Sequence, residues 1–190
     1  MSKIELRESA RAARHALGSQ NILALSENIR QKLENLEEFK ASNVIATYVS
    51  KQEEVQTEHI IRDALSNSKR VLVPLVVPRN KNLVFSELHD LSELAVGHFG
   101  ILEPKPEFVR PVALSEASMI IVPVVAWDER GYRIGNGGGY FDIALAPLKG
   151  NLTIGLAFEV QRVVKVPADE YDVPLKMIVT ESRILKFEKD

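Results

Sequence analysis

The sequence predicts an α/β protein, a single-domain three-layer α/β/α sandwich with a largely parallel central sheet. Stretches rich in β-branched and other apolar residues alternate along the chain with segments whose apolar residues recur at helical spacing. Such alternation is typical of sheets whose strands are joined by helices. No internal repeat, low-complexity tract or long linker divides the chain, so we expect one domain over residues 1–190.

Apolar periodicity defines the helices in the first part of the chain. Residues 2–17 predict a short helix, and residues 20–39 predict a second helix with apolar residues at helical period. The mostly β-branched stretch 43–50 predicts a strand. After a polar loop, Thr57 is a candidate N-cap for a helix that continues through Leu65.

Buried strands dominate the remainder, in which residues 90–113 and 163–175 are predicted as irregular segments. Residues 119–126 predict a buried strand that leads through a glycine-rich loop into a helix. The other predicted strands cover residues 70–77, 83–88, 152–158, 177–180 and 183–187. Ligands of parallel sheets bind at the carboxyl ends of the strands. We therefore expect the loops after Ser50, Asp128 and Phe158 to share one rim of the sheet.

Composition excludes several classes of function. The formal net charge of −2 gives no support to broad nucleic-acid binding. The absence of cysteine excludes disulfides, thiolate metal sites and thiol nucleophiles. There is no apolar signal core and no stretch of about eighteen apolar residues. We therefore expect a cytoplasmic protein that contacts neither membrane nor nucleic acid, as a monomer or a weak homo-oligomer.

The glycine-rich loop is the strongest functional motif. Residues 131–139 hold five of the ten glycines, within the sequence Gly-Tyr-Arg-Ile-Gly-Asn-Gly-Gly-Gly-Tyr-Phe-Asp at 131–142. The spacing matches neither the P-loop nor the Rossmann pattern, and a purely structural turn is the alternative. Glycine amides suit anion binding, Arg133 suits phosphate, and Asp142 suits a magnesium ion. A helix that starts at Tyr140 would add a positive end.

A basic stripe is predicted on the first helix. Lys3, Arg7, Arg11 and Arg14 are spaced by four, four and three residues, which aligns them along one side of a helix. A solvated basic face is one interpretation. The alternative is a second phosphate clamp that folding brings to the glycine-rich loop.

Three further groups remain ambiguous from the residues alone. Glu54 follows a predicted strand end, where a carboxylate either meets a ligand or faces solvent. The segment that begins with Phe99 is either a packed turn or an apolar wall under a flat ligand. The acidic cluster of Asp169, Glu170 and Asp172 is either a solvated turn or part of a metal environment.

Taken together and in order, these segments resemble the 5-formyltetrahydrofolate cyclo-ligase family. The matching segments are Lys3–Arg7, Ile45–Tyr48, Glu54–Thr57, Phe99–Pro104, Val122–Asp128, Gly131–Arg133, Gly137–Asp142, Gly155–Gln161 and Asp172–Pro174. The resemblance implies an enzyme that uses ATP and magnesium to convert 5-formyltetrahydrofolate to 5,10-methenyltetrahydrofolate, with release of ADP and phosphate. In that family the formyl oxygen attacks the γ-phosphate, and a phosphorylated intermediate then closes the ring.

The resemblance also implies residue roles. Catalytic roles fall on Arg133, Lys3 and Arg7, and the magnesium carboxylate falls on Asp142. ATP contacts fall on Lys3, Ile4, Glu5, Leu6, Arg7, Arg133, Ile134, Gly135, Asn136, Gly137, Gly138, Gly139, Tyr140 and Phe141. Folate contacts fall on Val49, Glu54 and Phe99. Arg11 and Arg14 either attract the glutamate tail of folate or face solvent.

Three positions depart from the family pattern. Asn136 stands where a basic residue is usual, Ile143 replaces a common arginine, and Lys176 replaces a common second carboxylate. These departures motivate a second hypothesis, a catalytically weak paralogue that binds nucleotide or folate as a sensor. A nucleic-acid-binding protein is a third and weaker hypothesis, because the chain lacks a basic surplus.

Overall fold

The centre of the protein is an eight-stranded sheet with strand order β12-β11-β10-β7-β1-β2-β3-β6. The computed structural model describes residues 1–77, 82–148 and 150–187. The strands are β1 (Val44–Thr47), β2 (Arg70–Val77), β3 (Asn82–Leu88), β6 (Pro111–Val112), β7 (Met119–Pro123), β10 (Leu152–Leu156), β11 (Met177–Val179) and β12 (Ile184–Lys186). The inner strands pair in parallel, whereas β3, β6 and β12 pair antiparallel at the edges. The predicted fold class, an α/β protein with a largely parallel sheet, is confirmed.

Alternate residues of the central strands face two separate cores. Ile45 and Ile121 pack into a core with helices α2 (Gly18–Asn35), α3 (Glu37–Ala41) and α4 (Glu58–Ser66). Ala46 and Ile120 face the opposite core, which Leu145 of α5 (Tyr140–Leu145) helps to close. Because side chains alternate across a strand, a strand that is apolar throughout buries both of its faces.

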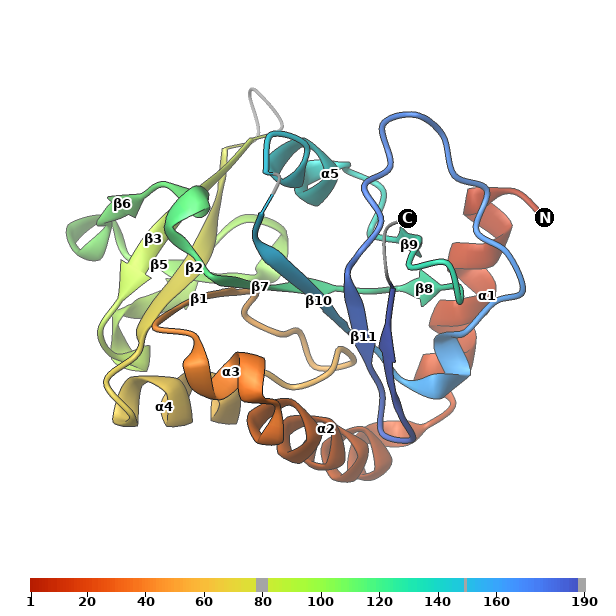
Figure 1. The fold of residues 1–190 in the computed structure, drawn as a ribbon, viewed down its shortest axis with the longest axis horizontal. Helices are drawn as coiled ribbons and strands as arrows, with labels where there is room; N and C mark the ends of the chain where they lie inside the picture. The colour runs from red at the N-terminus through yellow and green to blue at the C-terminus, as the bar shows by residue number, and fades with distance from the viewer. Residues whose placement is uncertain (78–81, 149, 188–190) are drawn as a thin grey trace.

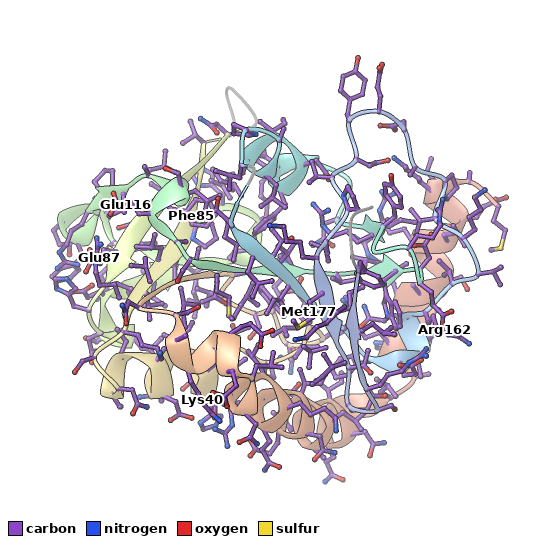
Figure 2. All side chains as sticks on the ribbon, viewed as in Figure 1. Lys40, Phe85, Glu87, Glu116, Arg162 and Met177 are labelled. Carbon is purple, nitrogen blue, oxygen red and sulfur yellow. The ribbon has the colours of Figure 1, made fainter. Side chains whose placement is uncertain are left out.

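Figure 1 shows the resulting layers, with α2, α3 and α4 on one side of the sheet and α5 on the other. Helix α1 (Lys3–His15) lies at the end of the sheet beside the small hairpin of β8 (Ala126–Trp127) and β9 (Arg133–Ile134). Figure 2 shows Met177 and Phe85 inside the protein, and both are almost fully buried. Within the described ranges, no helix is long and apolar enough to cross a membrane.

The predicted helix at residues 20–39 is two helices, so that prediction was wrong in detail. Leu36 has an extended backbone, with φ −64° and ψ 135°, and it separates α2 from α3. The change of direction lets Leu33 of α2 and Phe39 of α3 both enter the same core. Periodicity alone missed the break because both helices continue the apolar pattern.

Thr57 does precede α4 as predicted, but its side chain does not cap the helix. Its hydroxyl donates to the carbonyl of Tyr48 at 2.9 Å and accepts from the amide of Ser50 at 3.1 Å. The residue therefore holds the segment that follows β1 against the start of α4.

The predicted strand at residues 119–126 ends at Pro123, and the chain then enters the β8–β9 hairpin before the glycine-rich loop. The side-chain amide of Gln161 donates to the carbonyls of Val124 and Val125, each at 2.8 Å. A buried side chain from another loop thus satisfies the backbone where the sheet ladder stops.

The irregular segment at residues 90–113 contains short elements around a hairpin of β4 (Leu94–Val96) and β5 (Leu102–Pro104). Single 3₁₀ turns cover Leu91–Glu93, His98–Gly100, Pro106–Phe108, Leu114–Glu116 and Glu159–Gln161. Arg110 makes a bidentate ion pair with the buried Glu93 at 2.8 and 2.9 Å. This ion pair joins the two ends of the segment. The hairpin tip at His98–Gly100 reaches the site described next.

Candidate active site

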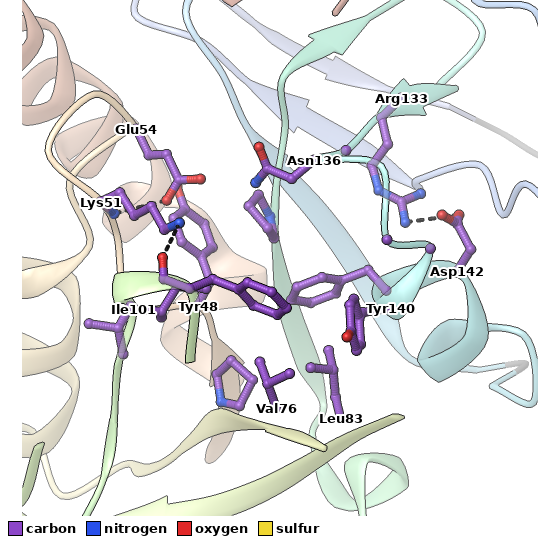
Figure 3. Close-up of a pocket in the computed structure, with 18 of the residues that line it drawn as sticks. Tyr48, Lys51, Glu54, Val76, Leu83, Ile101, Arg133, Asn136, Tyr140 and Asp142 are labelled. Carbon is purple, nitrogen blue, oxygen red and sulfur yellow. Dashed lines mark hydrogen bonds and ion pairs between the residues drawn. The ribbon is translucent and has the colours of Figure 1, made fainter. Parts of the chain in front are cut away.

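One cavity of about 390 Å³ lies where β1 and β7 end. Figure 3 shows its two ends, with Lys51 and Glu54 at one and Arg133 and Asp142 at the other. The lining residues are Arg11, Tyr48, Val49, Lys51, Glu54, Pro74, Val76, Leu83, Phe99, Ile101, Pro123, Arg133, Gly135, Asn136, Gly138, Gly139, Tyr140, Phe141 and Asp142. The loops after Ser50 and Asp128 therefore share one rim, as expected. No residue of the loop after Phe158 lines the cavity, and Gln161 of that loop bonds to the carbonyls of Val124 and Val125.

The glycine-rich loop has the backbone that its composition requires. Gly137 and Gly139 have φ angles of 103° and 72°, which residues with a Cβ rarely adopt. Helix α5 begins at Tyr140, as predicted, directly after Gly139. A Cβ on Gly137 would stand 3.6 Å from the guanidinium carbon of Arg7, so the loop and helix α1 lie in close contact.

Helix α1 brings its basic stripe to this loop. The Nε of Arg7 donates to the carbonyl of Gly135 at 2.9 Å, and the Nη2 of Arg11 donates to Oδ1 of Asn136 at 2.9 Å. Lys3 instead donates to Asp169, at 2.9 Å, and to Asp172. The acidic cluster of the 163–175 loop is therefore bonded to the N-terminal end of α1.

Arg14 occupies a different environment from the rest of the stripe. Its side chain is 8% exposed, and its Nη2 lies 3.9 Å from Oε2 of Glu53. Among the described residues, its Nε and Nη1 have no hydrogen-bond partner. Arg14 is thus a buried cation behind the cavity and does not line it.

None of the five residues of the predicted Lys3–Arg7 segment lines the cavity. Lys3 and Arg7 make the contacts given above, and the other three side chains have structural surroundings. Ile4 is 63% exposed. Glu5 accepts from the amide of Ser2 at 2.7 Å and completes a capping box that starts α1. Leu6 is buried in a small core with Ile134, which also does not line the cavity. Of these three side chains, Leu6 is the one that packs α1 against the hairpin that precedes the glycine-rich loop.

The buried Arg133 and the partly exposed Asp142 form an ion pair at one end of the cavity. The Nη2 of Arg133 donates to Oδ1 of Asp142 at 3.0 Å, and its Nη1 donates to the carbonyl of Val173 at 2.8 Å. The amide of Val173 donates to the same Oδ1 at 3.3 Å. Burial lowers the pKa of Arg133, against the opposing effect of the Asp142 charge.

Within the described ranges, the Asp142 carboxylate has one oxygen that no hydrogen bond engages. Both of its side-chain hydrogen bonds use Oδ1, and no described residue bonds to Oδ2. The described part of the chain has no group of three or more acidic or histidine side chains suited to a metal. A single carboxylate still fits magnesium, because this ion commonly takes one or two carboxylates and completes its shell with phosphate oxygens and water.

The opposite end of the cavity carries the predicted folate contacts. One carboxylate oxygen of Glu54, Oε2, accepts from the amide of Lys51 at 2.9 Å. The Nζ of Lys51 donates to the carbonyl of Phe99 at 2.8 Å (Figure 3). Phe99 has a left-handed backbone, with φ 56° and ψ 20°, and its exposed ring meets Tyr140 edge-on at 6.4 Å. A non-glycine residue in this conformation is strained, and strain of this kind accumulates at binding sites.

Several lining residues were not among the predicted site residues. Lys51, Tyr48 and the apolar wall of Pro74, Val76 and Leu83 have no local signal beyond ordinary strand and loop patterns. Tyr48 is buried, its hydroxyl donates to the carbonyl of Val55 at 2.9 Å, and burial raises its pKa. Arg11 did have a signal, its place in the basic stripe, but the sequence did not indicate which face the stripe would meet.

Comparisons with known proteins find a matching family model, related sequences and a similar solved structure. The family model described as the 5-formyltetrahydrofolate cyclo-ligase family matches residues 1–181. A 5-formyltetrahydrofolate cyclo-ligase of Escherichia coli is 35% identical over 146 residues, which cover 75% of this chain and 80% of that protein. The 5-formyltetrahydrofolate cyclo-ligase of Mus musculus is 28% identical over 190 residues, with 95% and 94% covered. The NMR structure of Aquifex aeolicus 5,10-methenyltetrahydrofolate synthetase is similar with a TM-score of 0.87 and 32% identity, and the match covers 100% of this chain and 95% of that one.

Proposed function

Because the chain belongs to the 5-formyltetrahydrofolate cyclo-ligase family and is an enzyme of that family, we propose that it converts 5-formyltetrahydrofolate to 5,10-methenyltetrahydrofolate with ATP and magnesium. The observation that carries this proposal is the single cavity that both Glu54 and Asp142 line. A carboxylate suited to pterin N–H groups thus lies in the same space as a glycine-rich loop suited to phosphate.

The proposed reaction asks the protein for positioning and for neutralisation of charge. The formyl oxygen attacks the γ-phosphorus of ATP, the bond to ADP breaks, and a phosphorylated imidate forms. The neighbouring aniline nitrogen then attacks the formyl carbon and loses its proton, and phosphate leaves with the former formyl oxygen. Since phosphoryl transfer needs little covalent help from the protein, a site of glycine amides, arginines and one carboxylate is sufficient, and no nucleophilic side chain is required.

Each proposed role has a structural basis. Arg7 touches the loop through Gly135, so it is placed to bind phosphate oxygens that the loop amides also bind. Arg133 is fixed on both sides by Asp142 and Val173, which gives it a defined direction at the cavity wall. Oδ2 of Asp142 would hold magnesium, which supplies charge neutralisation at the phosphates.

Folate binding is proposed at the other end. Glu54 would accept hydrogen bonds from the pterin through Oε1, because its Oε2 already accepts from Lys51. Val49 lines the floor, and the exposed ring of Phe99 offers an apolar face to the ring system.

The departures from the family pattern support catalysis more than a sensor role. The Nζ of Lys176 donates to the carbonyl of Gly150 at 3.2 Å, and Lys176 does not line the cavity. Ile143 is half-exposed on α5 and also lies outside the lining. Neither residue lines the cavity, so Asn136 is the departure that lies in the site itself.

The test is a turnover assay on the purified protein. With 5-formyltetrahydrofolate, ATP and magnesium we expect a product that absorbs in the near ultraviolet, and no product when either ATP or magnesium is omitted. An active relative serves as the positive control. Absence of product at high enzyme concentration would reject the proposal, and calorimetric binding of ATP or folate without turnover would establish the sensor instead.

A further inference from the structure

Helix α1 presents two arginines, one turn apart, to consecutive residues of the glycine-rich loop. Arg7 donates to the carbonyl of Gly135, and Arg11 donates to the side chain of Asn136, each over 2.9 Å. Residues four positions apart on a helix lie on the same face. Two guanidinium groups therefore lie along one side of the loop. Arg11 and its partner Asn136 also line the cavity, whereas Arg7 does not.

Across the described residues, no carboxylate forms an ion pair with Arg7 or Arg11. Arg133, by contrast, is paired with Asp142 at 3.0 Å. Two unpaired like charges at one loop repel each other, and an anion bound between them and the loop amides would remove that repulsion.

Asn136 gives Arg11 a fixed direction. An arginine has five N–H donors, and the described residues engage one of them, on Nη2. The acceptor is Oδ1 of Asn136, so the amide orientation is set by the guanidinium. The remaining donors of Arg11 are then available to a ligand in the cavity.

We infer that Arg11 is a further phosphate-binding residue for the nucleotide, and that Asn136 is the residue that positions it. This inference rests on the proposed binding of ATP at the glycine-rich loop. Asn136 carries no charge, but its hydrogen bond holds the guanidinium of Arg11, from helix α1, beside the glycine-rich loop. The loop thus obtains a basic group from another element instead of from its own sequence.

The equilibrium affinity for magnesium-ATP in the absence of folate tests this inference. Without folate there is no acceptor for the phosphoryl group, so the measurement reports nucleotide binding alone. Arg11→Met keeps the side-chain length and removes the charge, and it should weaken magnesium-ATP binding about tenfold, as expected for loss of a charge-assisted hydrogen bond. Asn136→Ala should weaken it about threefold, because the guanidinium is no longer oriented. Arg11→Lys should restore part of the loss, since it keeps the charge without the planar fork.

A double-mutant cycle separates positioning from independent contacts. If Asn136 acts through Arg11, adding Asn136→Ala to Arg11→Met should cause no further loss of magnesium-ATP affinity. The affinity for 5-formyltetrahydrofolate with one glutamate should stay within about twofold in every variant. Arg62→Met is the matched control, because Arg62 is an exposed helical arginine on α4 that pairs with Glu58, and it should bind as the wild type does.

Three results would overturn the inference while the proposed function stands. They are wild-type magnesium-ATP affinity in Arg11→Met, losses that add in the double variant, and a loss in Arg11→Met that falls on folate instead of on the nucleotide. The last result would assign Arg11 to the carboxylates of folate. A wild-type protein that does not bind magnesium-ATP would instead reject the proposed function, and this inference with it.

Discussion

Asp142 combines a structural and a proposed chemical role in one carboxylate. Oδ1 accepts from Arg133 and from the amide of Val173, while Oδ2 has no partner among the described residues. The side chain of Arg133 is 3% exposed, so its charge depends on Asp142 for compensation. Removal of the whole carboxylate therefore disturbs more than metal binding.

The two roles of Asp142 predict different outcomes for two substitutions. Asp142→Asn removes the charge but keeps an oxygen that accepts from Arg133 and Val173, so it should abolish magnesium-dependent turnover and cost less stability than Asp142→Ala. Asp142→Ala should lower the free energy of unfolding by about 2 kcal/mol, because it leaves both donors without an acceptor as well as the guanidinium without a counter-charge. Urea unfolding and turnover at varied magnesium concentration measure both effects.

The proposed metal role of Asp142 fails if Asp142→Asn turns over as the wild type does at low magnesium concentration. The structural role fails if Asp142→Ala unfolds at the wild-type urea concentration. Each role can thus be rejected without the other.

At the scale of elements, helix α1 links parts of the chain that are far apart in sequence. Its stripe meets the glycine-rich loop through Arg7 and Arg11, and it meets the 163–175 loop through Lys3. Its opposite side buries Leu6 and Ala10 beside β8. Lys3 already has two carboxylate partners, so its predicted contact with ATP requires the ammonium group to share its three donors.

The bonds of Lys3 predict how pH acts on this junction. Burial lowers the pKa of Lys3, but its hydrogen bonds to Asp172 and Asp169 outweigh burial and raise the pKa above 10.5. The hydrogen bond from Lys3 lowers the pKa of Asp169 below 3.8. Stabilisation through Asp169 is therefore fully present above pH 3.8 and is lost as the pH falls through the lowered value. Stabilisation through Lys3 is fully present below pH 10.5 and is lost as the pH rises through the raised value.

Carboxyl chemical shifts of Asp169, followed by NMR over pH, measure this link. In Lys3→Met the titration midpoint of Asp169 should rise toward its ordinary value, and the unfolding free energy at pH 7 should fall by at most about 1 kcal/mol, because the pair is exposed. An unchanged midpoint would show that Lys3 does not pair with Asp169 in solution. Glu8→Gln on the same helix is the control.

The boundaries of most elements could be predicted, but their partners could not. Apolar periodicity was sufficient for α1 and for the late strands β11 and β12. It failed at Leu36, where two helices share one apolar pattern, and at Pro123, where a buried strand gives way to a hairpin. Periodicity reports which face is apolar, whereas the angle between two elements depends on what packs against that face.

At the scale of the whole molecule, the two cores share the same strands. Ile45 and Ala46 are neighbours on β1, yet they pack into different cores on opposite sides of the sheet. Neither core can be lost without exposing the other face of the central strands. We therefore propose that residues 1–190 behave as a single domain.

A single domain predicts one cooperative unfolding transition. Scanning calorimetry should show one peak, with an unfolding enthalpy of about 130 kcal/mol near 60 °C for a chain of this length. The ratio of calorimetric to van't Hoff enthalpy should be close to one. Two peaks, or a ratio well above one, would show that parts of the chain unfold independently.

The sequence by itself determined the fold class, the order of most elements and the glycine-rich loop, because strand and helix patterns depend on residues a few positions apart. Only the tertiary structure decided that Arg11 meets Asn136, that Lys3 meets Asp172, and that Glu54 shares a cavity with Asp142. The first two contacts join residues 125 and 169 positions apart. Such distances follow from the order of strands in the sheet and from the way α1 packs at its end, which no local pattern encodes.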